Sequence, residues 1–229
     1  METRSKGNPP AADRIRLLYA DEALVVCDKP VGLSSESPGL PDRIREQESF
    51  AVFPVHRLDR TTGGVCVLAR SAAVCAEMQR LFQQDRVVKE YLAVVSGVPE
   101  TDSGSFSDLL YHDQRSNKTF VTEKMRKGVK EAFCEWKVEA VAEQEDAGKL
   151  SLVRVSLHTG RTHQIRVQFA SRKLPLVGDR RYGSRVRASS PALWAVRIRF
   201  PHPLEAGKEV DVSSAPPAGF PWSCFSSPV

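Results

Sequence analysis

The sequence predicts an α+β fold, in which a mostly antiparallel β-sheet is flanked by helices. Runs of β-prone residues outnumber helical runs, and most follow one another through short, hairpin-like connections. Because hairpins join antiparallel neighbours, we expect one sheet with the few amphipathic helices packed against it. No change of composition marks a boundary within residues 13–229, so a single domain is expected there, after a disordered tail over residues 1–12.

The first part of the chain predicts a hairpin followed by a polar loop. Residues 15–19 and 23–27 are β-prone runs around a short polar turn, and Pro30 and Gly32 then require a loop. Residues 34–50 are polar and show no clear period. A surface loop with one short helix is expected over them.

An amphipathic helix is expected between two further strands. The strands cover residues 65–68 and 89–95, and Ser71 is a suitable N-cap for a helix that runs to about residue 85. Four apolar side chains recur at helical spacing and are expected to pack on the sheet: Val74, Met78, Leu81 and Phe82.

The second half predicts a β-rich excursion with a charged tip. A polar, basic stretch over residues 104–128 leads to residues 132–140, which alternate like a half-buried strand. The segments that follow are a turn (143–148), a strand (150–157), a helix from near Thr162, a loop rich in glycine and proline (173–191), a strand (193–200) and a tail with six prolines.

The composition limits the class of protein. Lys and Arg number 33 against 28 Asp and Glu, a formal charge of +5 that fits a polyanionic partner such as nucleic acid. The five cysteines form no CxxC pair and no zinc-ligand spacing, which predicts a reducing cytoplasm and no structural metal. No apolar run approaches the about 18 residues of a membrane span, and the N-terminus lacks the apolar core of a signal peptide.

The stretch over residues 56–69, HRLDRTTGGVCVLA, carries the first candidate for chemistry. It places one carboxylate, Asp59, between the guanidinium groups of Arg57 and Arg60. Nearby positive charge favours the ionised carboxylate, which can act as a nucleophile or a base. The same string also fits a structural role, in which Asp59 serves only as an ion-pair partner of those arginines.

A second polar cluster, GRTHQIR, covers residues 160–166. On a helix that begins near Thr162, His163 and Arg166 share a stripe that can face a cleft, while Ile165 lies on an apolar stripe. In the structural alternative, the arginines are solvated and His163 caps or bonds the backbone. His163 is not expected to bind a metal, since no second His or Cys stands at ligand spacing.

Tyr91 is the third candidate. An aromatic side chain in a strand is usually core material, but Lys89 sets a cation beside this ring. Such a ring can stack on a base that has been pulled out of an RNA helix.

Five short motifs occur in one order along the chain. They are KPxGL (29–33), HRLDxxTxG (56–64), KxYxAxVxG (89–97), TGRTHQIRVQ (159–168) and GDxxYG (178–183). Together they resemble the RluA-type RNA pseudouridine synthases, and the resemblance spans residues 15 to about 205. It favours the functional interpretations of Asp59, Tyr91 and Arg166.

The resemblance implies a cofactor-free isomerase with the pseudouridine synthase catalytic fold, which flips specific uridines out of structured tRNA or rRNA and converts them to pseudouridine. Asp59 matches the family's catalytic aspartate, which attacks the ribose or the base while the N-glycosidic bond breaks. Tyr91 matches the ring that stacks on the target uracil. Arg166 matches the arginine that pairs with the aspartate, and Arg57 one that can fill the space left by the flipped nucleotide.

RNA is therefore the expected partner of a monomeric protein, with no membrane and no metal. Further substrate contacts are expected from the remaining polar and basic residues of the motifs: Arg60, Lys89, Arg161, His163, Arg180 and Arg181. No S4-type RNA-binding domain is expected before the first strand. Target selection is then expected from the loop over residues 34–50 and the basic excursion over residues 112–130.

Two positions depart from the family pattern. Gly63 stands where serine is usual, and a more flexible turn is expected there without loss of a catalytic role. Trp194 stands where histidine is usual in the late strand, which removes a supporting contact but not the chemistry.

Two other functions fit the motifs less well than an isomerase does. An RNA-binding protein that keeps the fold without catalysis is disfavoured because Asp59, Tyr91 and Arg166 are all present. A nucleoside glycosidase is disfavoured because such hydrolysis ordinarily needs two carboxylates and a water, whereas the motif supplies one carboxylate.

Overall fold

The computed structural model describes residues 14–225 and is built on one 11-stranded sheet. The strands are β1 (Arg16–Ala20), β2 (Leu24–Lys29), β3 (Phe53–Pro54), β4 (Gly63–Ala69), β5 (Val88–Ser96), β6 (Ser103–Asp113), β7 (Lys118–Thr122), β8 (Val129–Gln144), β9 (Gly148–Leu157), β10 (Leu193–Pro201) and β11 (Glu209–Ser213). The helices are α1 (Leu40–Glu48), α2 (Ala72–Gln83) and α3 (Gln164–Ser171), with short 3-10 helices η2 (Arg180–Tyr182) and η3 (Trp222–Cys224). The expected tail over residues 1–12 lies outside the described residues.

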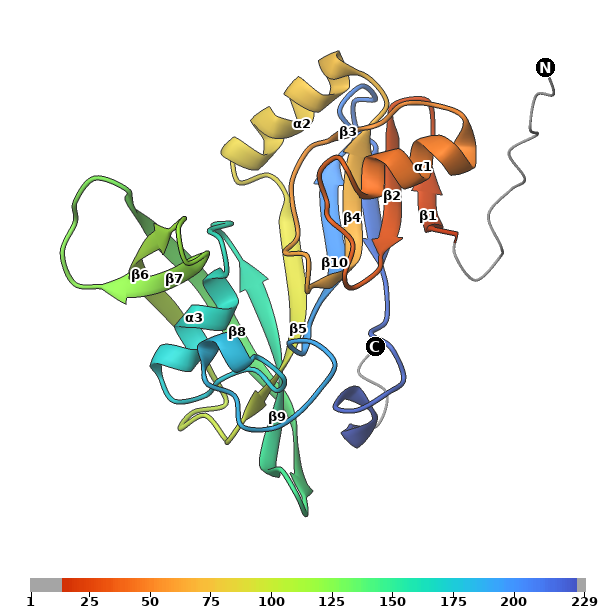
Figure 1. Ribbon diagram of the computed structural model, residues 1–229. Coiled ribbons are helices and arrows are strands. Elements are labelled where there is room, and N and C mark those ends of the chain that lie inside the picture. Colours follow the sequence, from red (N-terminus) through yellow and green to blue (C-terminus); the bar gives the residue numbers. More distant parts are fainter. Residues whose placement is uncertain (1–13, 226–229) are drawn as a thin grey trace.

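The sheet runs in the order β1-β2-β4-β10-β5-β9-β8-β6-β7, with β3 paired to β4 and β11 paired to β10. The pairing of β4 with β10 is parallel, and the other pairings of the named strands are antiparallel. Figure 1 shows α1 and α2 beside the part of the sheet that contains β1 to β4, and α3 beside the part that contains β6 to β8. The α+β prediction, a mostly antiparallel sheet with packed helices, is confirmed.

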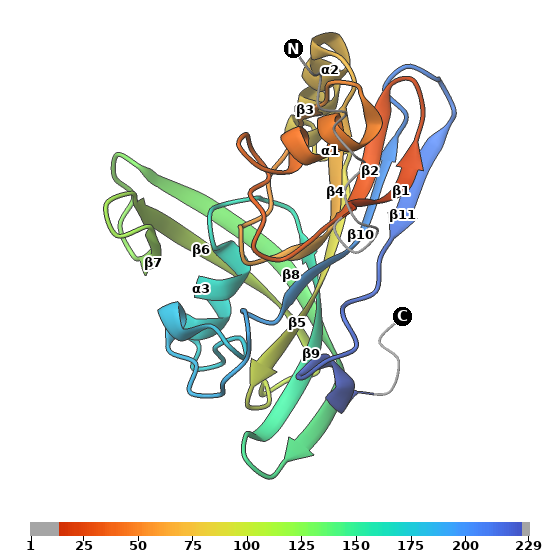
Figure 2. The same cartoon turned by 45° about the vertical axis from the view of Figure 1, so that its right-hand side comes forward.

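The helices cover opposite faces of the sheet. Alternate residues of β4 belong to different cores: Leu68 belongs to the core that contains apolar residues of α1 and α3, and Val67 to the core that contains those of α2. In α2 the Ser71 hydroxyl accepts a hydrogen bond from the Val74 N–H at 3.2 Å, as expected of the N-cap. In the strand order β5 lies at the middle of the sheet, between β10 and β9 (Figure 2).

Two segments differ from the sequence prediction. The helix expected near Thr162 begins at Gln164, because His163 has a left-handed backbone (φ 55°) that ends a preceding turn. The proline-rich tail contains β11 and η3, where composition gave no period to predict either element. Within residues 14–225, no helix combines the length and apolar character that crossing a membrane requires.

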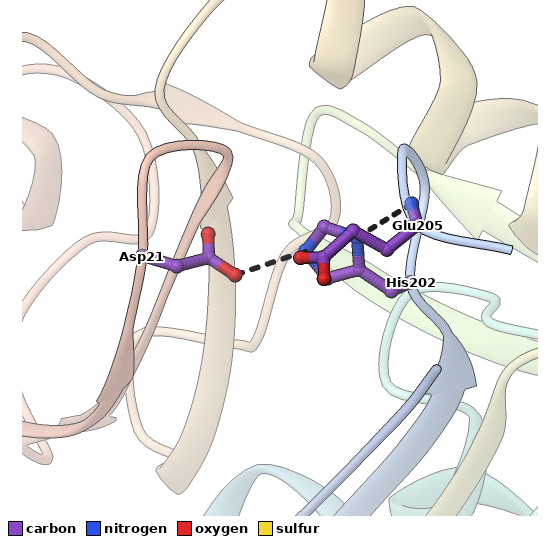
Figure 3. A group of neighbouring side chains, drawn as sticks. All are labelled: Asp21, His202 and Glu205. Carbon is purple, nitrogen blue, oxygen red and sulfur yellow. Dashed lines mark hydrogen bonds and ion pairs between the residues drawn. The ribbon is translucent and has the colours of Figure 1, made fainter. Parts of the chain in front are cut away.

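A polar cluster joins two turns at the end of the sheet (Figure 3). His202 Nε2 lies 2.9 Å from Asp21 Oδ2, and His202 Nδ1 accepts the backbone N–H of Glu205 at 3.0 Å. Since Nδ1 accepts, Nε2 carries the proton and donates to Asp21. Both ring nitrogens are thus used within the protein, and the cluster acts as a joint between the β1–β2 turn and the segment after β10.

Candidate active site

Asp59 lies in the loop between β3 and β4, and this loop is bonded to the loop that follows β2. The Gly32 N–H donates to the Arg60 carbonyl at 2.7 Å, and Arg60 Nε donates to the Gly32 carbonyl at 2.6 Å. The Ser35 hydroxyl accepts the Leu58 N–H and donates to the Leu58 carbonyl, each at 3.0 Å. The position of Asp59 is therefore set by the KPxGL segment as well as by its own motif.

The ion-pair partner of Asp59 is Arg166, whose Nη1 lies 3.2 Å from Asp59 Oδ2. The two arginines that flank Asp59 in the sequence point elsewhere. Arg57 is largely exposed and lies 3.6 Å from Glu36, and Arg60 bonds the backbone as described. The structural alternative, in which Asp59 is only an ion-pair partner of Arg57 and Arg60, is wrong, because adjacent side chains in a loop leave the backbone in different directions.

Arg166 is itself fixed by a second carboxylate. Its Nε and Nη2 donate to the two oxygens of Asp179 at 2.6 and 2.9 Å, and Asp179 is only 1% exposed. This bidentate pairing occupies one edge of the guanidinium group and leaves Nη1 for Asp59. The expected contact between Arg166 and Asp59 is thus present, although Arg166 is buried rather than facing an open cleft.

His163 is buried next to Asp59, with Nε2 3.8 Å from Asp59 Oδ2. Its Nδ1 lies 2.9 Å from the hydroxyl of Tyr182, which accepts the Thr119 N–H at 2.8 Å. Burial lowers the pKa of His163 to about 4, and the neighbouring Arg166 acts in the same direction against the pull of Asp59. The imidazole is therefore neutral at neutral pH.

Tyr91 projects from β5 into the same region and is 8% exposed. Burial raises the pKa of its phenol, and the nearby Asp59 carboxylate adds to the effect. The ring therefore stays uncharged and offers an apolar face. Tyr91 packs with Ala93 and Val95 in one core, as their alternation predicted.

Lys29 lies fully buried behind the Asp59 loop. Its ammonium donates to the carbonyls of Leu33 at 2.8 Å and Pro30 at 3.1 Å. Burial lowers its pKa to about 8, while Cys66 and Asp59 act in the opposite direction. Lys29 therefore binds two carbonyls of the loop after β2 and interacts electrostatically with the Asp59 carboxylate.

A cavity of about 870 Å³ opens above Asp59. Six of the residues expected to act on the substrate line it: Arg57, Asp59, Lys89, Tyr91, Arg161 and His163. Arg166 supports Asp59 from outside the lining. Arg60, Arg180 and Arg181 do not line the cavity, and Arg181 instead donates to the carbonyls of Ser116 at 2.7 Å and Asn117 at 3.0 Å.

Four residues in or beside the cavity received no role from the sequence. Asp179 and Tyr182 belong to the GDxxYG motif and Lys29 to the KPxGL motif. The motifs therefore marked these positions, although no residue taken alone indicated a role. Thr62 also lines the cavity, and within residues 14–225 its buried hydroxyl has no hydrogen-bond partner.

Gly63 and Trp194, the two departures from the family pattern, pack against each other. They are opposite residues of the parallel β4–β10 pair, and a Cβ at Gly63 would lie 2.2 Å from Cζ3 of the indole. The more flexible turn expected at Gly63 is absent, because this residue is buried at the start of β4. The tryptophan fills the space that a serine side chain would need.

The cavity is lined by a carboxylate held by an arginine, an aromatic ring, and the cations of Lys89 and Arg161, a combination that fits an enzyme acting on a nucleotide. The chain belongs to the RNA pseudouridylate synthase family, whose model matches residues 23–171. The family predicted from the motifs, a class of isomerases, is confirmed.

Relatives and solved structures agree with this assignment. The chain is 34% identical over 183 residues to an uncharacterised RNA pseudouridine synthase of Aquifex aeolicus, covering 74% of this chain but 56% of that protein. It is 31% identical to tRNA pseudouridine synthase C of Vibrio cholerae, covering 82% of this chain and 86% of that protein. The structure of human RNA pseudouridylate synthase domain containing 1 matches with a TM-score of 0.79 at 23% identity, over 92% of this chain and 87% of that one, which shows a shared fold.

Proposed function

We propose that this protein converts uridine to pseudouridine within tRNA or rRNA, with Asp59 as the catalytic carboxylate. The observation that carries the proposal is the relay from Asp179 through Arg166 to Asp59, which aims one carboxylate into the cavity beside Tyr91. Similar proteins are named tRNA pseudouridine synthase C in Vibrio cholerae and ribosomal large subunit pseudouridine synthase D in Borreliella burgdorferi, which supports RNA of these two classes as the substrate.

The target nucleotide is flipped out of its helix so that the uracil stacks on Tyr91 and the ribose faces Asp59. The exposed Arg57 stands at the rim of the cavity, where it fills the space that the nucleotide leaves. The neutral phenol suits this role because bases stack on the faces of uncharged aromatic rings. The cations of Lys89 and Arg161, which line the cavity, bind the polar edges of the nucleotide.

Asp59 then attacks either C1′ of the ribose or C6 of the uracil, while the bond between N1 and C1′ breaks. The detached uracil turns within the cavity, C5 bonds to C1′ and the bond to Asp59 breaks, which restores the carboxylate. The proton on C5 leaves as N1 gains one, so no atom is added or lost overall. Arg166 orients the Asp59 carboxylate for this attack. Since the base never leaves, no second carboxylate is needed to activate water.

The test is tritium release from RNA labelled at C5 of uridine. Total tRNA and rRNA from a strain that lacks the gene are incubated with purified wild-type protein, the Asp59→Asn variant and the Asp146→Asn variant. Wild type and Asp146→Asn are expected to release tritium, since Asp146 is exposed in the turn between β8 and β9, whereas Asp59→Asn is not. If wild-type protein releases no tritium from either RNA pool, the proposal is refuted. Free uracil among the products would indicate a hydrolase instead.

A further inference from the structure

The cavity above Asp59 continues into a second half that the isomerisation does not use. Beyond the last paired residues of β5 and β9, Glu90 and Ser156, the cavity is bordered by Phe82 and Asp85 near the end of α2. Phe133 of β8 also lines it. We call this region the outer half of the cavity, and define it by Phe82, Gln83, Asp85, Phe133 and His158.

Phe133 is an exposed aromatic side chain on an otherwise charged strand face. The outward residues of β8 around it are Glu131, Glu135 and Lys137, and Phe133 is 36% exposed. Its ring lies against the ring of His158, with 5.0 Å between centroids and a tilt of 35°. Because one side of the phenyl ring is packed and supported while the ring remains exposed to water, it forms a platform for another flat group.

The charges around this platform favour a neutral base over a phosphate. His158 lies between two carboxylates, 2.8 Å from Glu135 and 3.5 Å from Asp85. Carboxylates repel a phosphate but accept hydrogen bonds from the exocyclic amino groups of cytosine, adenine and guanine. Uracil has no such group.

Lys89 stands where the two halves of the cavity meet. Its ammonium is 3.4 Å from the His158 carbonyl and 5.7 Å from the centre of the Phe82 ring, and its side chain lies on the Tyr91 face of β5. A phosphate that links a base on Tyr91 to a base on Phe133 passes this cation. The arrangement thus alternates ring, cation and ring, as in grooves that hold unstacked single strands.

We propose that the outer half of the cavity binds a second unstacked base of the same RNA, next to the target uridine, which stacks on Phe133 and presents an amino group to Asp85 and Glu135. This inference rests on the proposed function, because it takes the uridine on Tyr91 as its reference point. The enzyme then selects uridines that have a cytosine, adenine or guanine neighbour able to leave the helix together with them.

The probes are fluorescein-labelled RNA trinucleotides with uridine in the centre: CUC, AUA and UUU. Fluorescence anisotropy is measured with wild type, Phe133→Ala, Phe133→Tyr and, as the control, Phe220→Ala, which removes another exposed phenyl ring outside the cavity. Wild type is expected to bind CUC and AUA more tightly than UUU. Phe133→Ala is expected to lose about 5- to 150-fold in affinity for CUC and AUA, the range that one stacked base provides, whereas Phe133→Tyr and Phe220→Ala match wild type.

Unchanged binding by Phe133→Ala, or equal wild-type affinity for UUU and CUC, would refute the second subsite. Tritium release separates this outcome from failure of the proposed function. An isomerase without the subsite keeps its KM in Phe133→Ala, whereas an isomerase with the subsite shows a raised KM at nearly unchanged kcat. If the protein binds CUC in a Phe133-dependent way but releases no tritium, the base-binding site is supported and the proposed isomerase activity is refuted.

Discussion

Placing a side chain at Gly63 tests the contact between Gly63 and Trp194. In Gly63→Ser, the new Cβ would lie 2.2 Å from Cζ3 and 2.9 Å from Cε3 and Cη2 of the indole. Carbon atoms in contact prefer about 3.5–4.0 Å, so ring or strand must shift by about 1 Å or more. The indole has little freedom to do so, because it is 8% exposed and its Nε1 donates to the Ser214 hydroxyl at 3.3 Å.

Overpacking of this kind costs about 1–3 kcal/mol. For a domain of this size each kcal/mol lowers Tm by about 2–4 °C, so Gly63→Ser is expected to melt about 2–12 °C below wild type. Trp194→His removes most of the indole and is destabilising in its own right, by about 3 kcal/mol. In the double variant, however, the serine occupies the vacated space.

The assay is thermal unfolding of wild type, both single variants and the double variant. The double variant is expected to be more stable than the sum of the two single losses predicts, by about 1–3 kcal/mol, since residues in direct contact are coupled. If the losses of stability in the two single variants simply add in the double variant, the reasoning is refuted, because the two residues then contribute to stability independently. Tritium release should follow the same pattern, because β4 begins four residues after Asp59.

Two further outcomes are expected, one from Asp179 and one from His56. Asp179→Asn should lower tritium release about 100-fold, because a reacting group misplaced by about 1 Å costs that much. The matched control is Asp211→Asn, which removes an exposed carboxylate paired with Arg197 at 2.8 Å. Equal losses of tritium release in the two variants would contradict the role of Asp179. Burial lowers the pKa of His56 to about 4 from its ordinary 6.5. Between these values the unfolded chain binds more protons than the folded chain. The free energy of unfolding should therefore decrease as the pH is lowered, by about 1.4 kcal/mol per pH unit for this group. Urea unfolding at pH 6.5 to 4 should show a shallower fall in His56→Gln, and identical slopes would contradict the assignment.

The parts of the fold that are visible in the sequence are those set by local periodicity. The alternation of Ala132, Cys134 and Trp136 and the helical stripe of α2 each reflect one buried face, and both were predicted correctly. The strand β11 was not predicted, because it depends on pairing with β10 rather than on its own pattern.

The candidate site was predictable as a set of motifs but not as a set of contacts. Sequence adjacency suggested that Arg57 and Arg60 hold Asp59, yet a loop residue's neighbours diverge, and the partner is Arg166 from a distant helix. The pairing of Arg166 with Asp179 is likewise tertiary. A sequence gives the chemical groups that a site needs, whereas the fold decides which of them meet.

The interlocked loops around Asp59 determine which molecule must change shape. Mutual bonds between Gly32 and Arg60, and between Ser35 and Leu58, hold the carboxylate in place. Under the proposed function, a carboxylate held in this way leaves the deformation to the RNA, since unstacking and unpairing a nucleotide costs a few kcal/mol and least where it is already mispaired or single-stranded. Selection among uridines then follows the flexibility of the RNA itself, and a uridine in a loose loop reacts before the same uridine in a stable duplex.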